Sequence, residues 1–557
     1  GAVAIVYDKA IHNLTIPVII VDNLEKELFR LIDLIYEKPY NELTMIGVTG
    51  TDGKTSVSTL TSYLLNHLSR CANIGTNGII YDKEIIDNVF TTPILTQNYS
   101  LLREFSNLGI SYVSMEVSSQ GIANKRIEGI LYDYAIFTNL SHEHLDTHKT
   151  MHNYFLTKLK LFKQLKKQGI MIVNKDDYYA KFFEKYSNVI YYSLFSPSDY
   201  QAIHIRYYQN HTVFDLKAKD FVLENLRVNR TEEYNIYNIL PAIIIALKEG
   251  LDVNLLYELL LDLPIIPGRL EKVPVKYPFD VYIDFAHTPN ALKNVLSALR
   301  KKAKRNIILV CGAAGNKDKT KRPLMGNVAT EYADYTIFTS EDPRLEDPND
   351  IIKEMTKMID LENPNYKIII NRQDALSYAF KIAKKDDIIL VTGKGRENFF
   401  EENNIIYPYS DFDYLFTAAP SIMWRLYGAD GTDKDYAIFK IPFINVVDKV
   451  FAKVRNLTYR YMPNQMTLFP METEQYDSWL MRELLNNSIA HSNYQLGGRI
   501  YVNEFDDKIK ITNPGDFIPQ KIENVLEVSY NPPFYRNQLL AEAMVAFHMI
   551  DTATLGI

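Results

Sequence analysis

The stretch LTMIGVTGTDGKTSVSTL, Leu43 to Leu60, decides the fold of the segment around it. An apolar run from Met45 to Val48 predicts a strand, the glycines that follow predict a tight loop, and the next residues predict a helix. In such a loop the backbone N–H groups face an anion, a lysine reaches the terminal phosphates and a threonine hydroxyl binds Mg²⁺. The predicted phosphate site comprises Gly50, Thr51, Asp52, Gly53, Lys54, Thr55 and Ser56.

The spacing of this loop differs from G-x-x-x-x-G-K-[ST], because Val48 stands where the first glycine belongs. An ordinary strand-to-helix turn is the alternative interpretation. The adjacent pair Lys54 and Thr55 favours the phosphate site.

The composition is that of an ordinary globular protein, with 47% hydrophobic and 23% charged residues in 557. This length predicts three or four domains. A net charge of -7 gives no reason to expect a polyanionic partner, and no nucleic-acid-binding element is visible. Cys71 and Cys311 are the two cysteines, so we expect a cytoplasmic protein without a disulfide framework. The sequence also lacks an apolar run of about 18 residues, so we expect no membrane span.

Strands and helices alternate along most of the chain, which predicts an α/β fold with mostly parallel sheets. Residues 1–40 have room for one or two strands and a helix, too little for an independent domain. Residues 41–263 contain the predicted strands Ser111 to Met115, Tyr134 to Thr138 and Ile170 to Asn174. We expect four units: 1–40, 41–263, 264–418 and a partial α+β unit, 419–557.

Side chains suited to metal binding follow two of these strands. Glu116 comes directly after the strand from Ser111 to Met115, and a carboxylate there suits Mg²⁺. The next strand ends in TNLSHEHLDTH, Thr138 to His148, where His144 is the candidate ligand of a second metal. A structural histidine is the alternative.

The segment MHNYFLTKLKLF, Met151 to Phe162, predicts an amphipathic helix that packs through Tyr154, Leu161 and Phe162. On composition alone, Lys158 of this helix is expected to be a surface lysine.

Many ordered motifs resemble those of the Mur ligases, from Gly1 to about Ala418. They are GVTGTDGKTS, TTP, MEVSSQG, FTNLSHEHLDTH, YFLTKLKLF, YNIYN, PGRLE, VYIDFAHTPNAL, KDKTKRPLMG, SEDPRLEDP and GKGRE. The resemblance implies a P-loop central domain followed by a Rossmann-like C-terminal domain. It also implies an ATP- and Mg²⁺-dependent ligase of peptidoglycan precursor synthesis. The particular likeness is to the ligases that add a diamino acid to UDP-N-acetylmuramoyl-L-alanyl-D-glutamate through an acyl phosphate.

The resemblance assigns roles to individual residues. Lys54, Lys158 and His144 would be catalytic, and Thr55, Glu116, His144 and a carbamylated Lys158 would bind magnesium. Beside the phosphate loop, ATP would contact Asn235, Asn238, Arg269, Asp284 and His287. The muramoyl dipeptide would contact Thr91, Thr92, Ser118, Asn124 and Arg126. The incoming amino acid would contact Lys317, Asp342, Pro343, Arg344, Gly393 and Glu397.

The third amino acid stays open in the sequence. Arg344 is retained from the pattern D-N-P-R of the family and favours meso-diaminopimelate. Asp342 replaces the asparagine of that pattern and favours a more cationic ligand such as L-lysine. Gln120, Glu143 and Arg396 are further departures from the family's motifs.

Residues from about Ser421 resemble a different family, the GHKL-like ATP-binding part of transcriptional regulators that begin with a Schlafen-like DNA-binding module. The motifs are RELLNNSIAHSNY, GGRIYVNEFDDKIKITNPG and YRNQLLAEAM. Glu483 and Asn487 lie one helical turn apart and form a second candidate nucleotide site. Asn513 stands where such ATPases have an adenine-reading aspartate, which favours a module that does not hydrolyse ATP.

One alternative function belongs to another class. The chain could be a nucleotide-binding regulatory or interaction protein, in which the ligase no longer turns over and ATP sets a conformation. That hypothesis predicts ATP binding without an amide product.

Overall fold

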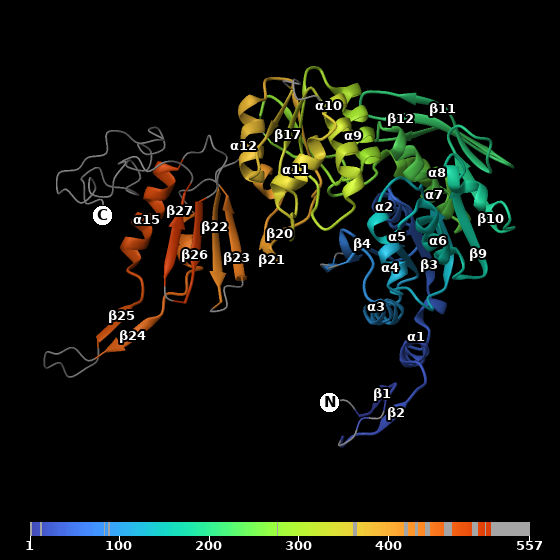
Figure 1. The fold of residues 1–557 in the computed structure, drawn as a ribbon, viewed down its shortest axis with the longest axis horizontal. Helices are drawn as coiled ribbons and strands as arrows, with labels where there is room; N and C mark the ends of the chain where they lie inside the picture. Colours follow the sequence, from blue (N-terminus) through green and yellow to red (C-terminus); the bar gives the residue numbers. More distant parts are fainter. Residues whose placement is uncertain are drawn as a thin grey trace.

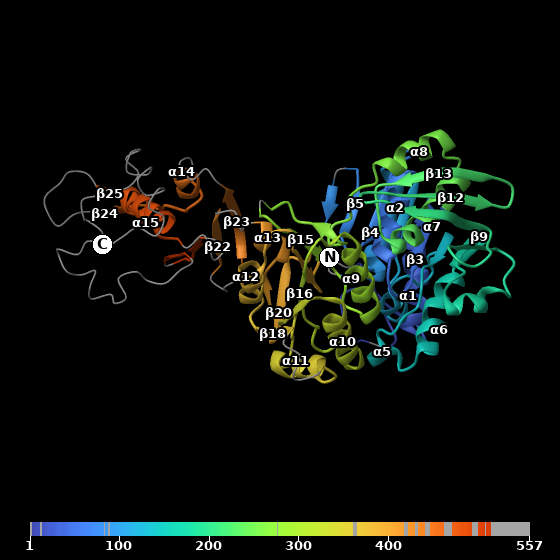
Figure 2. The ribbon, with the colours of Figure 1, turned by 90° about the horizontal axis from the view of Figure 1, so that it is seen from above.

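Three large sheets follow one another along the long axis of the computed structural model (Figures 1 and 2). The structure describes residues 3–9, 11, 14–82, 84–86, 88, 90–275, 277–359, 365–416, 421–428, 433–440, 446–461, 471–492, 500–506 and 508–513. Among these residues, no helix is long and apolar enough to cross a membrane.

The largest sheet has 11 strands in the order β13-β12-β11-β10-β9-β8-β3-β7-β4-β5-β6. Its middle pairs are parallel, and antiparallel pairs extend it at both edges. The strands are β3 (Thr44–Thr49), β4 (Cys71–Gly75), β5 (Gly78–Tyr81), β6 (Glu84–Ile86), β7 (Tyr112–Glu116), β8 (Tyr132–Phe137), β9 (Leu165–Asn174), β10 (Val189–Ser193), β11 (Tyr200–Tyr207), β12 (Thr212–Ala218) and β13 (Val222–Val228).

Helices cover both faces of this sheet. Met45 of β3 belongs to one buried apolar cluster and Ile46 and Val48 to another, because successive side chains of a strand point to opposite faces. The helices are α2 (Lys54–Leu65), α3 (Leu95–Asn107), α4 (Ser119–Ala123), α5 (Leu145–His148), α6 (Met151–Phe162), α7 (Glu233–Lys248) and α8 (Val253–Leu261), with 3-10 turns η1 (Pro39–Asn41) and η2 (Tyr178–Phe183).

The strand predictions were right in place and too short at some ends. β8 begins at Tyr132 instead of Tyr134, and β9 begins at Leu165 instead of Ile170. Both early starts contain charged residues, which an apolar run does not reveal. Asp133 accepts a hydrogen bond from the backbone of β3 and forms an ion pair with Lys166 of β9 at 2.8 Å, so these polar residues hold the strand edges together. β7 ends at Glu116, one position later than expected, so this carboxylate belongs to the strand itself.

The second sheet has six strands in the order β14-β15-β19-β16-β17-β18, and all neighbouring pairs except β14 with β15 are parallel. Its strands are β14 (Glu271–Lys272), β15 (Asp280–Asp284), β16 (Ile307–Cys311), β17 (Tyr335–Phe338), β18 (Tyr366–Ile368) and β19 (Ile388–Thr392). Around it lie α9 (Pro289–Lys302), η3 (Lys319–Lys321), α10 (Arg322–Tyr332), α11 (Pro348–Thr356), α12 (Arg372–Ile382), α13 (Asp411–Phe416) and the hairpin β20 (Phe399–Glu402) and β21 (Ile405–Pro408). Two doubly covered, mostly parallel sheets confirm the predicted α/β class.

The N-terminal segment contains β1 (Ile5–Tyr7), β2 (Val18–Ile20) and α1 (Leu24–Ile35). Asp33 of α1 accepts hydrogen bonds from the hydroxyls of Tyr40 and Tyr99, at 3.1 and 3.0 Å, which fix this helix against the first large unit.

The third large sheet has four strands in the order β23-β22-β26-β27. Its elements are β22 (Ser421–Tyr427), β23 (Asp433–Lys440), β26 (Ile500–Glu504) and β27 (Ile509–Thr512), with α14 (Val447–Phe451), α15 (Ser478–His491) and the pair β24 (Thr458–Tyr461) and β25 (Met471–Glu474) nearby. The core contains Trp424, whose Nε1 donates to Glu504 at 2.9 Å. The motif at 535–544 lies outside the described residues, as do residues 429–432.

Gly326 of α10 tests the packing of the second unit, because a Cβ there would lie 1.9 Å from the carbonyl oxygen of Met355 in α11. Gly326→Ala gains about 1 kcal/mol of helix propensity, but a clash with backbone costs about 1–3 kcal/mol. We expect a lower melting temperature in a thermal unfolding measurement. Asn327→Ala, at an exposed neighbour, is the control and should not lower it. A Gly326→Ala protein as stable as its parent would contradict the observed packing of the two helices.

Candidate active site

A cleft of about 1610 Å³ lies between the unit built on the 11-stranded sheet (the first large unit) and the unit built on the six-stranded sheet (the second large unit). Its lining includes residues at or just after the carboxyl ends of both sheets: Thr51 to Ser56 after β3, Glu116 of β7, Asp284 of β15 and Gly393 after β19. Parallel sheets of this kind bind ligands at that edge. The cleft is therefore the candidate active site.

Two glycines shape the predicted phosphate loop. A Cβ at Gly50 would lie 1.8 Å from Thr138 Oγ1, in the segment after β8. Gly53 has φ +86°, and a Cβ there would lie 2.5 Å from Asn238 Oδ1 of α7. Gly53 is also the N-cap of α2, so the backbone of the loop leads directly into a helix N-terminus. This is the geometry that suits a phosphate group.

Lys54 and Lys158 meet at one oxygen atom. The carbonyl of Gly50 accepts hydrogen bonds from Lys54 Nζ at 3.2 Å and from Lys158 Nζ at 2.6 Å. Burial lowers the pKa of Lys54, although Glu116 and Asp52 oppose that shift. Burial and the charge of Lys54 lower the pKa of Lys158 well below its ordinary value. The predicted catalytic lysines therefore converge, and their surroundings favour the uncharged form of each amine.

Lys158 is not the surface lysine that composition alone suggests. It is 1% exposed, and its ammonium group lies 4.5 Å from the ring centre of Tyr154, on the buried face of α6. Tyr154, Leu161 and Phe162 are buried as predicted. The interpretation from composition was wrong because the sequence of the helix does not show that the Gly50 carbonyl, from a distant part of the chain, accepts a hydrogen bond from Lys158.

Thr55 and Glu116 form a pair of hard oxygen donors. Thr55 Oγ1 donates to Glu116 Oε2 at 3.0 Å, and Glu116 is 1% exposed. Arg269 Nη2 approaches the same threonine hydroxyl at 2.8 Å from the second unit. No group of three or more histidine, cysteine, aspartate or glutamate side chains among the described residues is arranged for a metal. A hydroxyl and one carboxylate nevertheless fit Mg²⁺, which usually keeps several waters and uses one or two carboxylates.

His144 lies beside the two lysines. Burial, followed by the charge of Lys158, lowers the pKa of His144 to about 2, so the imidazole is neutral at pH 7. Its backbone adopts φ +58°, and Nδ1 lies 3.9 Å from Glu143 Oε1. A neutral imidazole has a lone pair for a metal.

The predicted nucleotide residues come from both units. Asn235 donates to Glu232 at 2.7 Å, and Asn238 is buried beside Gly53. Across the cleft, Asp284 accepts the backbone N–H of Ala286 at 2.7 Å, and burial raises its pKa to about 6. His287 is half-buried, desolvation lowers its pKa well below the ordinary value, and its carbonyl accepts a hydrogen bond from Lys321 Nζ at 2.7 Å.

Four of the five residues expected to contact the dipeptide form a connected group. Thr92 Oγ1 donates to the carbonyl of Glu116 at 2.9 Å, and the N–H of Ser118 donates to Thr92 at 3.0 Å. Arg126 Nη1 donates a hydrogen bond to the carbonyl of Thr92 at 3.0 Å. The hydroxyls of Thr91 and Thr76 lie 3.1 Å apart, and the N–H of Thr76 donates to Glu116 at 2.8 Å, which connects Thr91 to the group.

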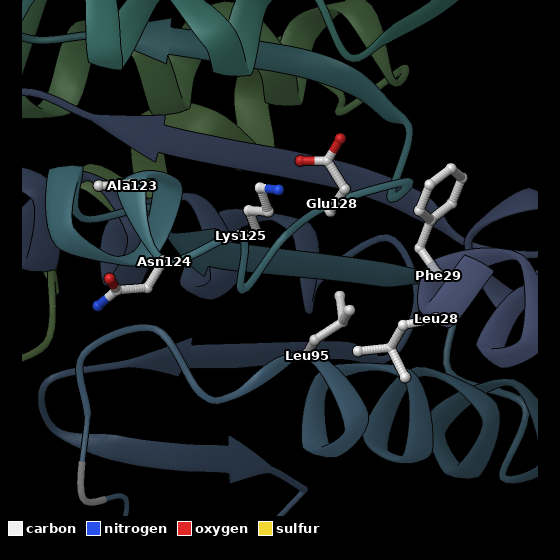
Figure 3. A pocket seen from close by; sticks show the side chains of 7 residues that line it. All are labelled: Leu28, Phe29, Leu95, Ala123, Asn124, Lys125 and Glu128. Carbon is white, nitrogen blue, oxygen red and sulfur yellow. The ribbon is translucent and has the colours of Figure 1, made fainter. Parts of the chain in front are cut away.

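Asn124 lies apart from this group. It lines a separate pocket of about 370 Å³ with Leu28 and Phe29 of α1, Leu95, Ala123, Lys125 and Glu128 (Figure 3). The structure does not bring Asn124 into the large cleft, so its role stays a prediction.

The residues expected to hold the amino acid cluster around a lysine that the sequence did not single out. Lys394 is 0% exposed and donates to both carboxylate oxygens of Asp342, at 2.9 and 2.8 Å, and to Glu397 at 3.0 Å. Arg344 pairs with Glu401 at 2.9 Å, and Gly315 would clash with Pro343 if it carried a Cβ. Burial lowers the pKa of Lys317 and raises that of Glu397. Asp342 thus has a cationic partner within the protein, which it shares with Glu397.

Contacts between the two units were also missed. Glu143, a departure from the family's motif, is 2% exposed and forms a buried ion pair at 3.0 Å with Lys321. Lys302 forms an ion pair with Glu232, and Asn290 Nδ2 donates a hydrogen bond to Asp52 Oδ2 at 3.4 Å. His142 lies 2.8 Å from Thr320. The charged residues of KDKTK were a visible signal, but their partners are more than 170 positions away.

The second candidate nucleotide site is a pair on α15. Asn487 Nδ2 donates to Glu483 Oε1 at 3.1 Å, as their spacing predicts. The role of this pair stays a prediction.

Three family descriptions match the chain. Residues 48–246 match the Mur ligase middle domain, and residues 268–395 match the Mur ligase, glutamate ligase domain. Residues 497–557 match the description "Putative ATP-dependent DNA helicase recG C-terminal".

Two relatives cover most of the chain. A UDP-N-acetylmuramyl-tripeptide synthetase 2 of Oceanobacillus iheyensis is 38% identical over 416 residues, which cover 72% of this chain and 82% of that protein. A UDP-N-acetylmuramoyl-L-alanyl-D-glutamate–2,6-diaminopimelate ligase of Caldanaerobacter subterraneus is 35% identical over 415 residues, covering 74% and 85%.

Solved structures agree with these relatives. A structure of a UDP-N-acetylmuramoyl-L-alanyl-D-glutamate–2,6-diaminopimelate ligase is 28% identical with a TM-score of 0.50, and the match covers 74% of this chain and 85% of that one. A folylpolyglutamate synthase of Mycobacterium tuberculosis, solved with ADP and AMPPCP, has a TM-score of 0.55 over 66% of this chain and 92% of its own. Its 17% identity indicates a shared fold alone.

The ion pair between Glu143 and Lys321 predicts how the two units stay together. Lys321→Met leaves a buried carboxylate without its partner, which costs about 3–5 kcal/mol. We therefore expect the two units to separate, with a larger radius of gyration in small-angle X-ray scattering. The double change Glu143→Gln with Lys321→Met should restore most of the compactness. Lys319→Met, at a more exposed lysine of the same segment, is the control; an equal effect there would refute the role of the buried pair.

Proposed function

Because the chain belongs to the Mur ligase family, we propose that it joins a diamino acid to UDP-N-acetylmuramoyl-L-alanyl-D-glutamate, driven by ATP, in peptidoglycan precursor synthesis. The observation that carries this proposal is the convergence of Lys54 and Lys158 on Gly50, beside the pair Thr55 and Glu116. The names of the relatives favour a ligase over a nucleotide-binding regulatory protein that does not turn over.

The reaction begins with a carboxylate, which is a poor electrophile. Transfer of the γ-phosphate of ATP to the D-glutamyl carboxylate gives an acyl phosphate, and Lys54 offsets the charge that develops on the transferred group. The amine of the third amino acid then attacks the activated carbonyl, and phosphate leaves. Ion pairs between the two units keep the two sides of the cleft together. This arrangement brings the two substrates close to each other and excludes water that would hydrolyse the intermediate.

Magnesium is part of the proposal through Thr55, Glu116 and His144, the residues that fit it in this cleft. The ion would neutralise charge on the phosphates when bound. The resemblance adds a carbamate on Lys158, which would turn a cation into an anionic ligand. A lowered pKa favours the neutral amine that such a modification needs.

The proposed third amino acid is meso-diaminopimelate. Lys394 pairs with Asp342 and Arg344 pairs with Glu401, and Lys317 brings a further cation to that end of the cleft. Diaminopimelate brings a second carboxylate, which lysine and ornithine lack. A guanidinium group suits a carboxylate because it can donate two parallel hydrogen bonds.

Lys54→Ala tests the ligase itself. Phosphate release from ATP should require both the muramoyl dipeptide and a diamino acid, and should fall by at least about 10²-fold in this variant, because a charged donor at the phosphates is lost. Lys160→Ala, an exposed lysine of α6, is the control with unchanged release. Release in the folded parent protein that ignores either substrate would contradict the proposal.

Arg344→Ala tests the choice of amino acid. In the parent protein, diaminopimelate should support faster ligation than lysine or ornithine, measured by product formation at equal concentrations. The variant should lose about 10–100-fold with diaminopimelate, from the loss of a hydrogen bond to a charged group worth about 1.5–3 kcal/mol. Its rate with lysine should change little, and exposed Arg305→Ala should change neither. Preference for lysine in the parent protein would overturn this assignment.

A further inference from the structure

Glu341 is a buried carboxylic acid at the edge of the cleft that none of the roles above uses. It follows β17, is 5% exposed and lines the cleft. Its Oε2 is buried without a hydrogen-bond partner. A buried carboxyl group normally has its oxygens satisfied, so an unpaired one requires an explanation.

Two glycines make room for this carboxyl group. A Cβ at Gly393, where φ is +103°, would lie 1.8 Å from Glu341 Oε2, and a Cβ at Gly312 would lie 2.8 Å from Glu341 Cβ. The N–H of Gly393 donates to the carbonyl of Asp284 at 3.2 Å. Glu341 therefore lies at the carboxyl ends of β16 and β19, beside Gly393, which the resemblance assigns to the incoming amino acid.

The charged groups around Glu341 already have other partners. Arg372 pairs with Asp411 at 2.6 Å, Lys394 pairs with Asp342, and Lys321 pairs with Glu143. These three cations and Asp342 are the charged groups whose fields reach Glu341, and Cys311 is a buried thiol nearby. Among the described residues, no ion pair involves Glu341. Burial raises the pKa of this carboxyl group to about 7, with Arg372 acting in the opposite sense.

Arriving amino acids carry ammonium groups at neutral pH, and an ammonium group has no lone pair with which to attack. We propose that Glu341 accepts the proton that the incoming ammonium group loses before it attacks the acyl phosphate. This inference rests on the proposed ligase function. Glu397 and Asp342 are less suited, because both accept hydrogen bonds from Lys394.

The proton balance is complete. The carboxylate of Glu341 takes one proton from R–NH₃⁺ and becomes a carboxylic acid, and the free amine forms the new C–N bond. The C–O bond to phosphate breaks, and the second proton of the amine leaves with the phosphate as HPO₄²⁻. Glu341 returns its proton to water after the products depart. A base works best when its pKa is close to the working pH.

The test compares two nucleophiles in the full-length protein with ATP and the muramoyl dipeptide. Diaminopimelate arrives as an ammonium ion and gives an amide, whereas hydroxylamine is already uncharged at neutral pH and traps the acyl phosphate as a hydroxamate. Glu341→Gln should slow amide formation by about 10²-fold or more, the usual contribution of a general base. Hydroxamate formation should change little. Glu331→Gln, an exposed glutamate of α10, is the charge-matched control and should change neither rate.

The pH dependence gives a second readout. The parent protein should lose amide formation as the pH falls through about 7, because Glu341 becomes protonated, and hydroxamate formation should not share this loss. Glu341→Gln should lack that inflection, and its amide rate should follow the concentration of free amine. Glu341→Asp keeps a carboxylate and should keep the inflection.

Different failures have different meanings. A folded parent protein that makes neither amide nor hydroxamate would refute the ligase function and, with it, the role of Glu341. A parent protein that makes both products with the same pH dependence would refute the role of Glu341 alone. So would a Glu341→Gln variant that slows both reactions equally or neither. The comparison within the parent protein remains decisive if Glu341→Gln does not fold.

Discussion

The close approach of two lysines to one carbonyl oxygen is the constraint on which this structure depends. Lys54 and Lys158 share one carbonyl oxygen, and burial disfavours the charged forms of both lysines and of Lys317. Burying an ammonium group without a counter-ion costs free energy, so these residues destabilise the protein on its own. Polyphosphates and carboxylates remove that cost when they bind. The same groups that are unfavourable in the free protein thus provide the free energy for recognising acidic substrates, as strained or charged sites often do.

The sequence predicted the local elements and missed the contacts that form only where the two large units meet. The phosphate loop, the strand before it and the strand end at Glu116 follow from apolar runs and from the positions of the glycines. The position of Lys158 could not be derived that way, because its partner is a carbonyl group 108 positions earlier. Nor could the pairing of Glu143 with Lys321, which exists only where two separately folded units meet. Resemblance supplied the role of Lys158. Lys394 and Glu341 lie within the motifs GKGRE and SEDPRLEDP, but neither the residues nor the resemblance assigned them a role.

Glycines act in the second unit mainly by leaving space. Gly393 and Gly312 accommodate Glu341, and Gly315 allows the backbone of Pro343 to approach. These positions define one side of the amino-acid end of the cleft. Sequence motifs such as GKGRE therefore mark where a neighbouring group must fit, in addition to any ligand contact.

Glu232 contacts both a residue that the resemblance assigns to ATP and a lysine of the second large unit. Its carboxylate holds Asn235, a predicted nucleotide contact, and pairs across the cleft with Lys302 of the second unit. Any movement of that unit therefore alters the electrostatic surroundings of the Asn235 amide, which the resemblance assigns to ATP. Under the proposed assignment of Asn235 to ATP, this one side chain makes a thermodynamic linkage: nucleotide binding and the position of the second unit each change the free energy of the other by the same amount.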